Sequence, residues 1–176
     1  MCLVAPNYTV FSNTRSQNHW IKKHGGYPTK DHFVVYHERP CNAIYLAVGG
    51  FYQKGVYKAN PDDILVANGD IGDNETAGFD PIFFLHHCFI DNVFRTWQKY
   101  NNSTIAGDLA IEPGYCETIS DDGLPNIPPD TPLDMSSPLD PFERPDGSVY
   151  TSFHVTDISN QLGYDYGIGS LDASNT

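Results

Sequence analysis

The stretch that decides the fold is residues 80–100, with the sequence DPIFFLHHCFIDNVFRTWQKY. Asp80 is a suitable N-cap, and Pro81 suits the first helical position, where its missing N–H costs nothing. Apolar residues recur at three- and four-residue spacing: Ile82, Leu85, Phe89, Val93 and Trp97. Much of the remaining surface is apolar too, so we predict a helix over 81–100 that is buried on more than one side.

Two adjacent histidines, His86 and His87, lie in this predicted helix, and Asp91 follows His87 by one helical turn. A buried imidazole needs a partner, which can be a metal ion, a carboxylate or a backbone carbonyl. The residues alone leave two readings open. One is a metal site, and the other is a pair of hydrogen-bonded core histidines.

A second, shorter helix is predicted over residues 39–48, RPCNAIYLAV. Pro40 suits its first turn, and Gly49-Gly50 supplies the stop. Residues 51–79 contain many turn formers and are predicted to form a long loop.

The rest of the chain gives weaker signals. Residues 1–36 show no clear periodicity, and their histidines stand among polar residues, which predicts surface positions for His19, His24 and His32. Residues 121–147 are rich in proline and are predicted to form a wrapping loop. The alternation in 148–156 predicts a strand, which contains His154.

Residues 78–91 resemble the second copper-binding motif of tyrosinases and hemocyanins, Asp-Pro-x-Phe-x-x-His-His-x-x-x-Asp. The resemblance implies that the second histidine, His87, binds copper. It also implies that His86 and Asp91 support that ligand from neighbouring positions.

The resemblance extends upstream to a His-Asn-x-Ile-His-x-x-x-Gly-Gly pattern, which residues 41–50 match except at both ligand positions. Asn42 fits the pattern as a supporting residue, whereas Cys41 and Tyr45 replace the two histidines. Downstream, segments reaching residue 166 resemble the end of fungal tyrosinase domains. The matching region is thus about 38–166.

The resemblance implies a mainly α fold, half of a tyrosinase-like four-helix bundle with two core helices that pack antiparallel, long loops and little β structure. We expect one domain fragment over 1–176. The family's first copper site, another set of three histidines, is expected before residue 38, where no histidines have its spacing.

The replaced positions change the expected metal chemistry. Cys41 as a thiolate prefers Cu(I) or Zn(II). Tyr45 is a weak ligand, because its hydroxyl loses a proton only near pH ~10. A packing role remains open for both. A site of His37, Cys41 and His87, holding zinc with an open fourth position, is a further alternative.

Three functions follow, and the sequence assigns catalysis to no particular residue. The resemblance implies a copper-dependent phenol or catechol oxidase, whose activity we expect to be impaired because the first site is absent and two ligands of the second are replaced. One alternative is a zinc-dependent hemocyanin-like enzyme of fungal secondary metabolism, of the cyclopenase type that converts cyclopenin to viridicatin. Another is a non-catalytic binding protein.

The composition argues against two classes of binding partner. The net charge of −12, with 10 lysines and arginines, argues against nucleic acids and anionic membranes. The resemblance implies a small phenolic or alkaloid-type molecule as the substrate. The start of the chain does not resemble a signal peptide, so a cytoplasmic location is expected, with secretion left open. Half a bundle leaves an apolar face, which a homo-oligomer would cover.

Overall fold

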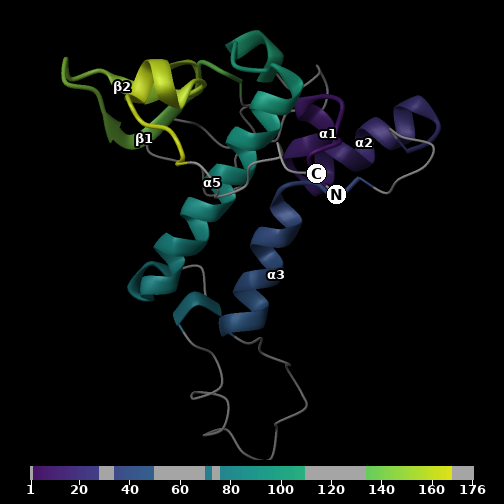
Figure 1. Ribbon diagram of the computed structural model, residues 1–176, viewed down its shortest axis with the longest axis horizontal. Coiled ribbons are helices and arrows are strands. Elements are labelled where there is room, and N and C mark those ends of the chain that lie inside the picture. The colour runs from purple at the N-terminus through teal and green to yellow at the C-terminus, as the bar shows by residue number, and fades with distance from the viewer. Residues whose placement is uncertain (1, 28–33, 50–69, 73–75, 110–133, 168–176) are drawn as a thin grey trace, which may run out of the picture. The chain divides into compact units, whose positions relative to one another are not determined.

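The computed structural model describes residues 2–27, 34–49, 70–72, 76–109 and 134–167. This part of the chain is mainly helical and includes one two-stranded sheet (Figure 1). It divides into two compact units. The first contains Met1–Tyr36 with Arg95–Thr176, and the second contains His37–Phe94. The mainly α fold class predicted from the sequence is confirmed.

Two N-terminal helices, α1 (Tyr8–Ser12) and α2 (Thr14–His24), belong to the first unit and were not predicted. Each is capped by an asparagine. The Asn7 side chain accepts a hydrogen bond from the amide of Val10, and the Asn13 side chain accepts one from the amide of Ser16. Gly25 ends α2 in the left-handed conformation, with φ 72°. The two capping asparagines and Gly25 are start and stop signals for helices that the sequence contains.

The core of the first unit forms around Trp97 of α5 (Pro81–Asn101). The indole N–H donates to the carbonyl of Ala5 at 2.9 Å, and the ring stacks on Phe11 at a centroid distance of 4.5 Å. The buried Gln98 amide donates to the carbonyl of Thr156 at 2.6 Å. These bonds connect the helix to segments far away in sequence and satisfy buried polar groups.

The C-terminal segment of the first unit contains the strands β1 (Pro138–Glu143) and β2 (Val149–Thr151), which pair antiparallel. The strand predicted over 148–156 is confirmed only for β2. β2 ends at Thr151, and a short 3-10 helix, Ser152–His154, follows it. The backbone N–H of Thr151 donates a hydrogen bond to Nδ1 of His154 and so caps this helix. The wrapping loop predicted over 121–147 is wrong where β1 lies, because the prolines of β1 mask the alternation of a strand.

An ion-pair cluster around the buried Arg95 lies in the same unit. Arg95 on α5 contacts the carboxylates of Asp157 at 3.4 Å and Asp165 at 3.5 Å. Lys99, one turn along the helix, contacts Asp165 at 3.1 Å. These pairs and other hydrogen bonds lower the pKa of both carboxyl groups, which keeps them charged. The cluster fixes the C-terminal segment to α5.

The second unit contains α3 (Glu38–Gly49), the first part of α5, and two short 3-10 helices, Asp70–Gly72 and Ala77–Phe79. The helices predicted over 39–48 and 81–100 are thus confirmed to within one residue at each end. The predicted N-cap is also confirmed, because the Asp80 carboxylate accepts a hydrogen bond from the amide of Ile82 at 3.0 Å.

Contacts between α3 and α5 run in opposite directions along the two helices. His37, at the start of α3, reaches Ile90, whereas Tyr45, two turns later, packs edge-on against Phe83. The helices therefore pack antiparallel, as predicted. At the end of α3 a Cβ on Gly49 would collide with the backbone of Gly72, so this close approach requires glycine.

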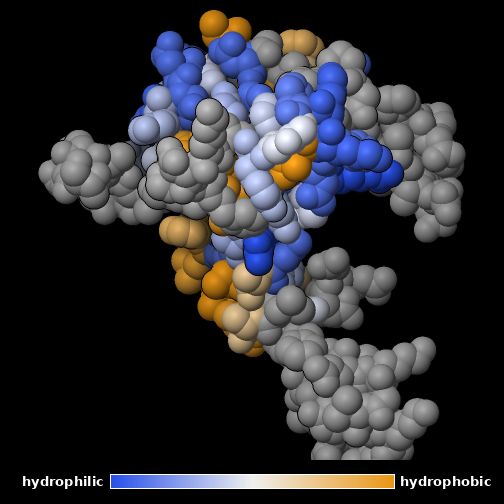
Figure 2. Space-filling view, turned by 90° about the vertical axis from the view of Figure 1, so that its right-hand side faces the viewer, coloured by the Kyte–Doolittle hydropathy of each residue, from blue (hydrophilic) through white to orange (hydrophobic). Residues whose placement is uncertain are grey.

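The expected burial of α5 on more than one side is wrong for its first half. Phe84, Leu85 and Phe89 are 61%, 72% and 50% exposed, whereas Val93 and Trp97 further along are buried. Figure 2 shows a large patch of hydrophobic residues in the lower part of the view and smaller hydrophobic groups elsewhere. Within the described residues of the second unit, one long helix covers one side of α5, so the opposite side has no packing layer.

Several predictions concern other parts of the chain. His19 and His24 are exposed, as predicted. His32, most of the loop over 51–79 and the part of 121–147 before residue 134 lie outside the described residues. None of the helices in the described part has the length and apolarity that crossing a membrane requires.

Candidate metal centre

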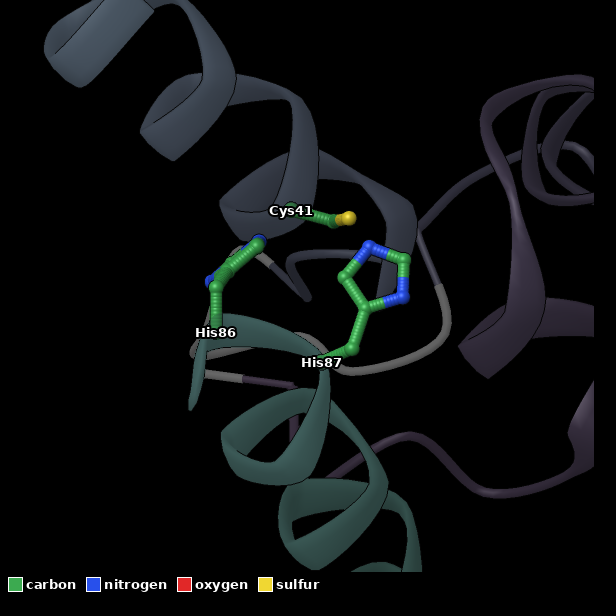
Figure 3. Close-up of side chains that lie close together, drawn as sticks. All are labelled: Cys41, His86 and His87. Atoms are coloured by element: carbon green, nitrogen blue, oxygen red, sulfur yellow. The ribbon is translucent and has the colours of Figure 1, made fainter. Parts of the chain in front are cut away.

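Three side chains from two helices of the second unit meet in one cluster. Cys41 comes from α3, and His86 and His87 come from the first half of α5 (Figure 3). Their sulfur and ring-nitrogen donors all lie within 4.8 Å of one another. Antiparallel packing brings position 41 opposite positions 86 and 87, so the cluster follows directly from the helix arrangement.

His87 is exposed, and Tyr45 of α3 holds its ring. The Tyr45 hydroxyl lies 2.8 Å from Nε2 of His87, and the imidazole stacks on Phe83 at a centroid distance of 4.2 Å. In Figure 3 the ring nitrogen remote from Cβ, which is Nε2, faces the Cys41 sulfur. When the phenol donates this hydrogen bond, it uses the lone pair that a metal ion would need.

His86, by contrast, is 6% exposed. Its Nε2 atom is buried and has no hydrogen-bond partner among the described residues. Burial first, and the neighbouring His87 second, lower the pKa of His86 below its ordinary value of 6.5, while the backbone of Cys41 acts in the opposite direction. The ring is therefore neutral at pH 7, and a neutral imidazole nitrogen is a metal ligand.

Cys41 and Tyr45 are both protonated at neutral pH when no cation is bound. Burial, and then the nearby Glu38 carboxylate, raise the pKa of the Cys41 thiol. Burial and Cys41 raise the pKa of the Tyr45 phenol. A bound metal ion would instead favour the deprotonated form of Cys41, because thiol ligands bind as thiolates. The phenol stays a hydrogen-bonding group.

The structure does not place His37 in this cluster. Its Nε2–H donates to the backbone carbonyl of Ile90 at 2.8 Å, and its ring lies beside Phe94. Burial lowers its pKa, and the charge of Asp91 acts in the opposite direction. The charge of Asp91 thus raises the pKa of His37. Asn42 is exposed on α3.

The donors present fit one metal ion. One sulfur and two imidazole nitrogens form a set that suits Cu(I) and Zn(II), and the buried Nε2 of His86 needs a partner. The set does not reproduce the three imidazoles that the resemblance implies for copper. The resemblance implied only a supporting role for His86, because it assigns the copper to the second histidine of the pair, and adjacency alone does not tell which of the two turns inward.

Comparison with known proteins agrees with the resemblance. The family described as the common central domain of tyrosinase matches residues 1–100, including the N-terminal segment that the motifs did not cover. The tyrosinase HcTyr2 of Hahella sp. is 47% identical over 97% of this chain, and a tyrosinase of Aspergillus oryzae is 41% identical over 94%.

A solved tyrosinase structure from Burkholderia thailandensis matches 97% of the chain with a TM-score of 0.76 and 44% identity. The chain spans 30% and 32% of the length of the two relatives and 31% of the solved chain. The match of the family to more than half of the chain, the identity and the shared fold agree with one another. The chain belongs to the tyrosinase family.

Proposed function

We propose that these 176 residues form a metal-binding member of the tyrosinase family that has little or no phenol or catechol oxidase activity of its own. Cys41 and His87 contribute the metal ligands. The observation that carries the proposal is the arrangement at the two replaced positions. Cys41 directs a thiol into the cluster, and Tyr45 directs a phenol onto Nε2 of His87.

The chemistry of the donors supports this proposal. The resemblance implies a pair of coppers, each held by three imidazoles, that bind dioxygen between them. A thiolate stabilises Cu(I) or Zn(II), and a neutral phenol is a poor ligand. Within the described residues, one cluster of metal-binding side chains is present. Reduction of dioxygen to peroxide takes two electrons, one from each copper of the pair. A single ion in this donor set lacks the second copper that this reduction requires.

The test begins with the purified chain, loaded with copper under nitrogen and then exposed to air. Oxidation of 4-methylcatechol is followed by quinone absorbance against a blank of copper with albumin. We expect no turnover above the blank and no peroxo-dicopper absorption band. Turnover together with about two coppers per chain would contradict the proposal.

A restoration experiment examines the replaced positions directly. The double change Cys41→His with Tyr45→His recreates the three-imidazole set, so the affinity for Cu(II) should rise. Cys88→His, which places an additional histidine at an exposed position of α5, is the control for non-specific copper binding. Equal Cu(II) affinity in the double variant and the native chain would mean that positions 41 and 45 do not contact the ion.

Zinc chemistry is the second candidate, and the thiol among two imidazoles favours it. Zn²⁺ in such a set keeps one coordination position open and polarises a carbonyl or amide as a Lewis acid. This reading corresponds to a non-redox enzyme with an alkaloid-type substrate. Elemental analysis of the protein as expressed separates the candidates, since one zinc per chain without copper supports the non-redox enzyme.

A further inference from the structure

The buried Nε2 atom of His86 is the strongest unexplained feature of the described residues. The side chain is 6% exposed, and the atom has no hydrogen-bond partner within the described part of the chain. A buried polar atom without a hydrogen bond has lost its contacts with water and gained none in exchange. Native proteins rarely leave such a group unsatisfied, so a partner for this nitrogen is expected.

The two nearest candidate partners identify the kind of group that belongs there. The Cys41 sulfur and a ring nitrogen of His87 lie within 4.8 Å of the donor nitrogen of His86 and of each other. Once the thiol is deprotonated, each of the three atoms has a lone pair to offer to a cation. A cation at their centre satisfies all three at once.

The spacing of the donors is compatible with one small ion. Zn–S bonds of about 2.3 Å and Zn–N bonds of about 2.0–2.1 Å place tetrahedral ligands roughly 3.3–3.6 Å apart. From separations of up to 4.8 Å, the donors need to approach one another by at most about 1.5 Å. Only Tyr45 must give way, because its hydroxyl occupies Nε2 of His87.

We infer that His86 is itself a ligand, and that Cys41, His86 and His87 together hold one thiophilic closed-shell ion, Cu(I) or Zn(II). This inference rests on the proposed function and adds a third donor to it. Binding forms one metal–sulfur and two metal–nitrogen bonds. The thiol proton leaves to solvent, and no electron is transferred. The ion takes the place of the hydrogen-bond partner that His86 lacks.

The experiment uses the full chain with Zn(II) and, in a separate anaerobic arm, Cu(I) as its acetonitrile complex. Affinity is measured by competition with a chromophoric chelator, and X-ray absorption at the metal edge counts sulfur and imidazole ligands. We expect one ion per chain with one sulfur and two imidazoles. The arm with the tighter binding identifies the preferred ion.

Variants assign the ligands. Cys41→Ser and His86→Gln should each weaken binding at least 10-fold, whereas the exposed Cys88→Ser and His19→Gln should leave it unchanged. Since His86→Gln disturbs a buried position, the ligand count in the native chain provides the measurement that is independent of its folding.

The outcomes separate the two claims. One sulfur with a single imidazole, together with unchanged affinity in His86→Gln, would overturn this inference and leave the proposed function intact. Absence of stoichiometric binding, or unchanged affinity in Cys41→Ser, would overturn both.

Discussion

The hydroxyl oxygen of Tyr45 lies 2.8 Å from Nε2 of His87, so a phenol from α3 occupies the nitrogen of α5 that faces the Cys41 sulfur (Figure 3). The resemblance places a histidine at position 45. Replacing an imidazole by a protonated phenol converts a ligand into a competitor. The phenol satisfies His87 when no ion is bound and must be displaced when one binds.

Removing this competitor should strengthen metal binding. The change Tyr45→Phe deletes a hydrogen bond that contributes about 1 kcal/mol, which corresponds to roughly fivefold tighter binding of Zn(II). Competition titration with a chromophoric chelator measures the effect. The change Tyr100→Phe, at a position 66% exposed on the same helix as His87, is the control. Weaker binding in Tyr45→Phe would show instead that the phenol oxygen assists the ion.

Stability should depend on pH through His37. Burial lowers its pKa in the folded chain below the ordinary 6.5, so the unfolded chain takes up the proton first as the pH falls. The free energy of unfolding should therefore decrease as the pH falls below about 6.5 and towards the pKa of the folded state. In His37→Gln, which keeps a donor for the carbonyl of Ile90, this decrease should be smaller.

Urea unfolding at pH 7.5, 6.5 and 5.5, in the presence of a chelator, tests this expectation. The exposed His19 provides the matched control, since His19→Gln should retain the native slope. An identical pH slope in His37→Gln and the native chain would argue against a lowered pKa.

Adding one methyl group at the end of α3 should destabilise the second unit. A Cβ on Gly49 would collide with backbone atoms of Gly72, which cannot rotate away as a side chain does. We expect Gly49→Ala to lower the free energy of unfolding by about 1–3 kcal/mol, although alanine is the better helix former.

The control for this change lies in the same unit. A Cβ on Gly78 meets no atom within 4 Å, and its backbone has no positive φ. Urea midpoints, read by circular dichroism, should fall for Gly49→Ala and remain near native for Gly78→Ala. Equal midpoints for the two variants would mean that α3 does not approach Gly72 this closely.

The core of the first unit should depend on the indole N–H of Trp97. Trp97→Phe keeps an aromatic ring against Phe11 but leaves the buried carbonyl of Ala5 without its donor. The expected loss of stability is about 1–3 kcal/mol, measured by urea unfolding. Trp20→Phe, at a half-buried position of α2, should cost less. A smaller loss in Trp97→Phe than in Trp20→Phe would contradict this assignment.

Prediction from the sequence succeeded where the signals were local. The helix over residues 81–100 contains its own N-cap, first-turn proline and apolar spacing, and the helix over 39–48 contains its own start and stop. β1 was not predicted, because its prolines obscure the alternation of a strand. The exposure of Phe84 and Leu85 was not predicted either, since the apolar character of a side chain does not reveal which element packs against that side chain.

The sequence by itself determined the family motif, the two helices that carry it and the replacement of two ligand positions by Cys41 and Tyr45. Only the tertiary structure decided that Nε2 of His86 is buried without a hydrogen-bond partner in the described part of the chain, and that His87 is exposed and bonded to Tyr45. Adjacent residues of a helix point about 100° apart, so one of two neighbouring histidines must face the packing partner less directly. The packing of α3 against α5 decides which one, and no local pattern encodes that packing.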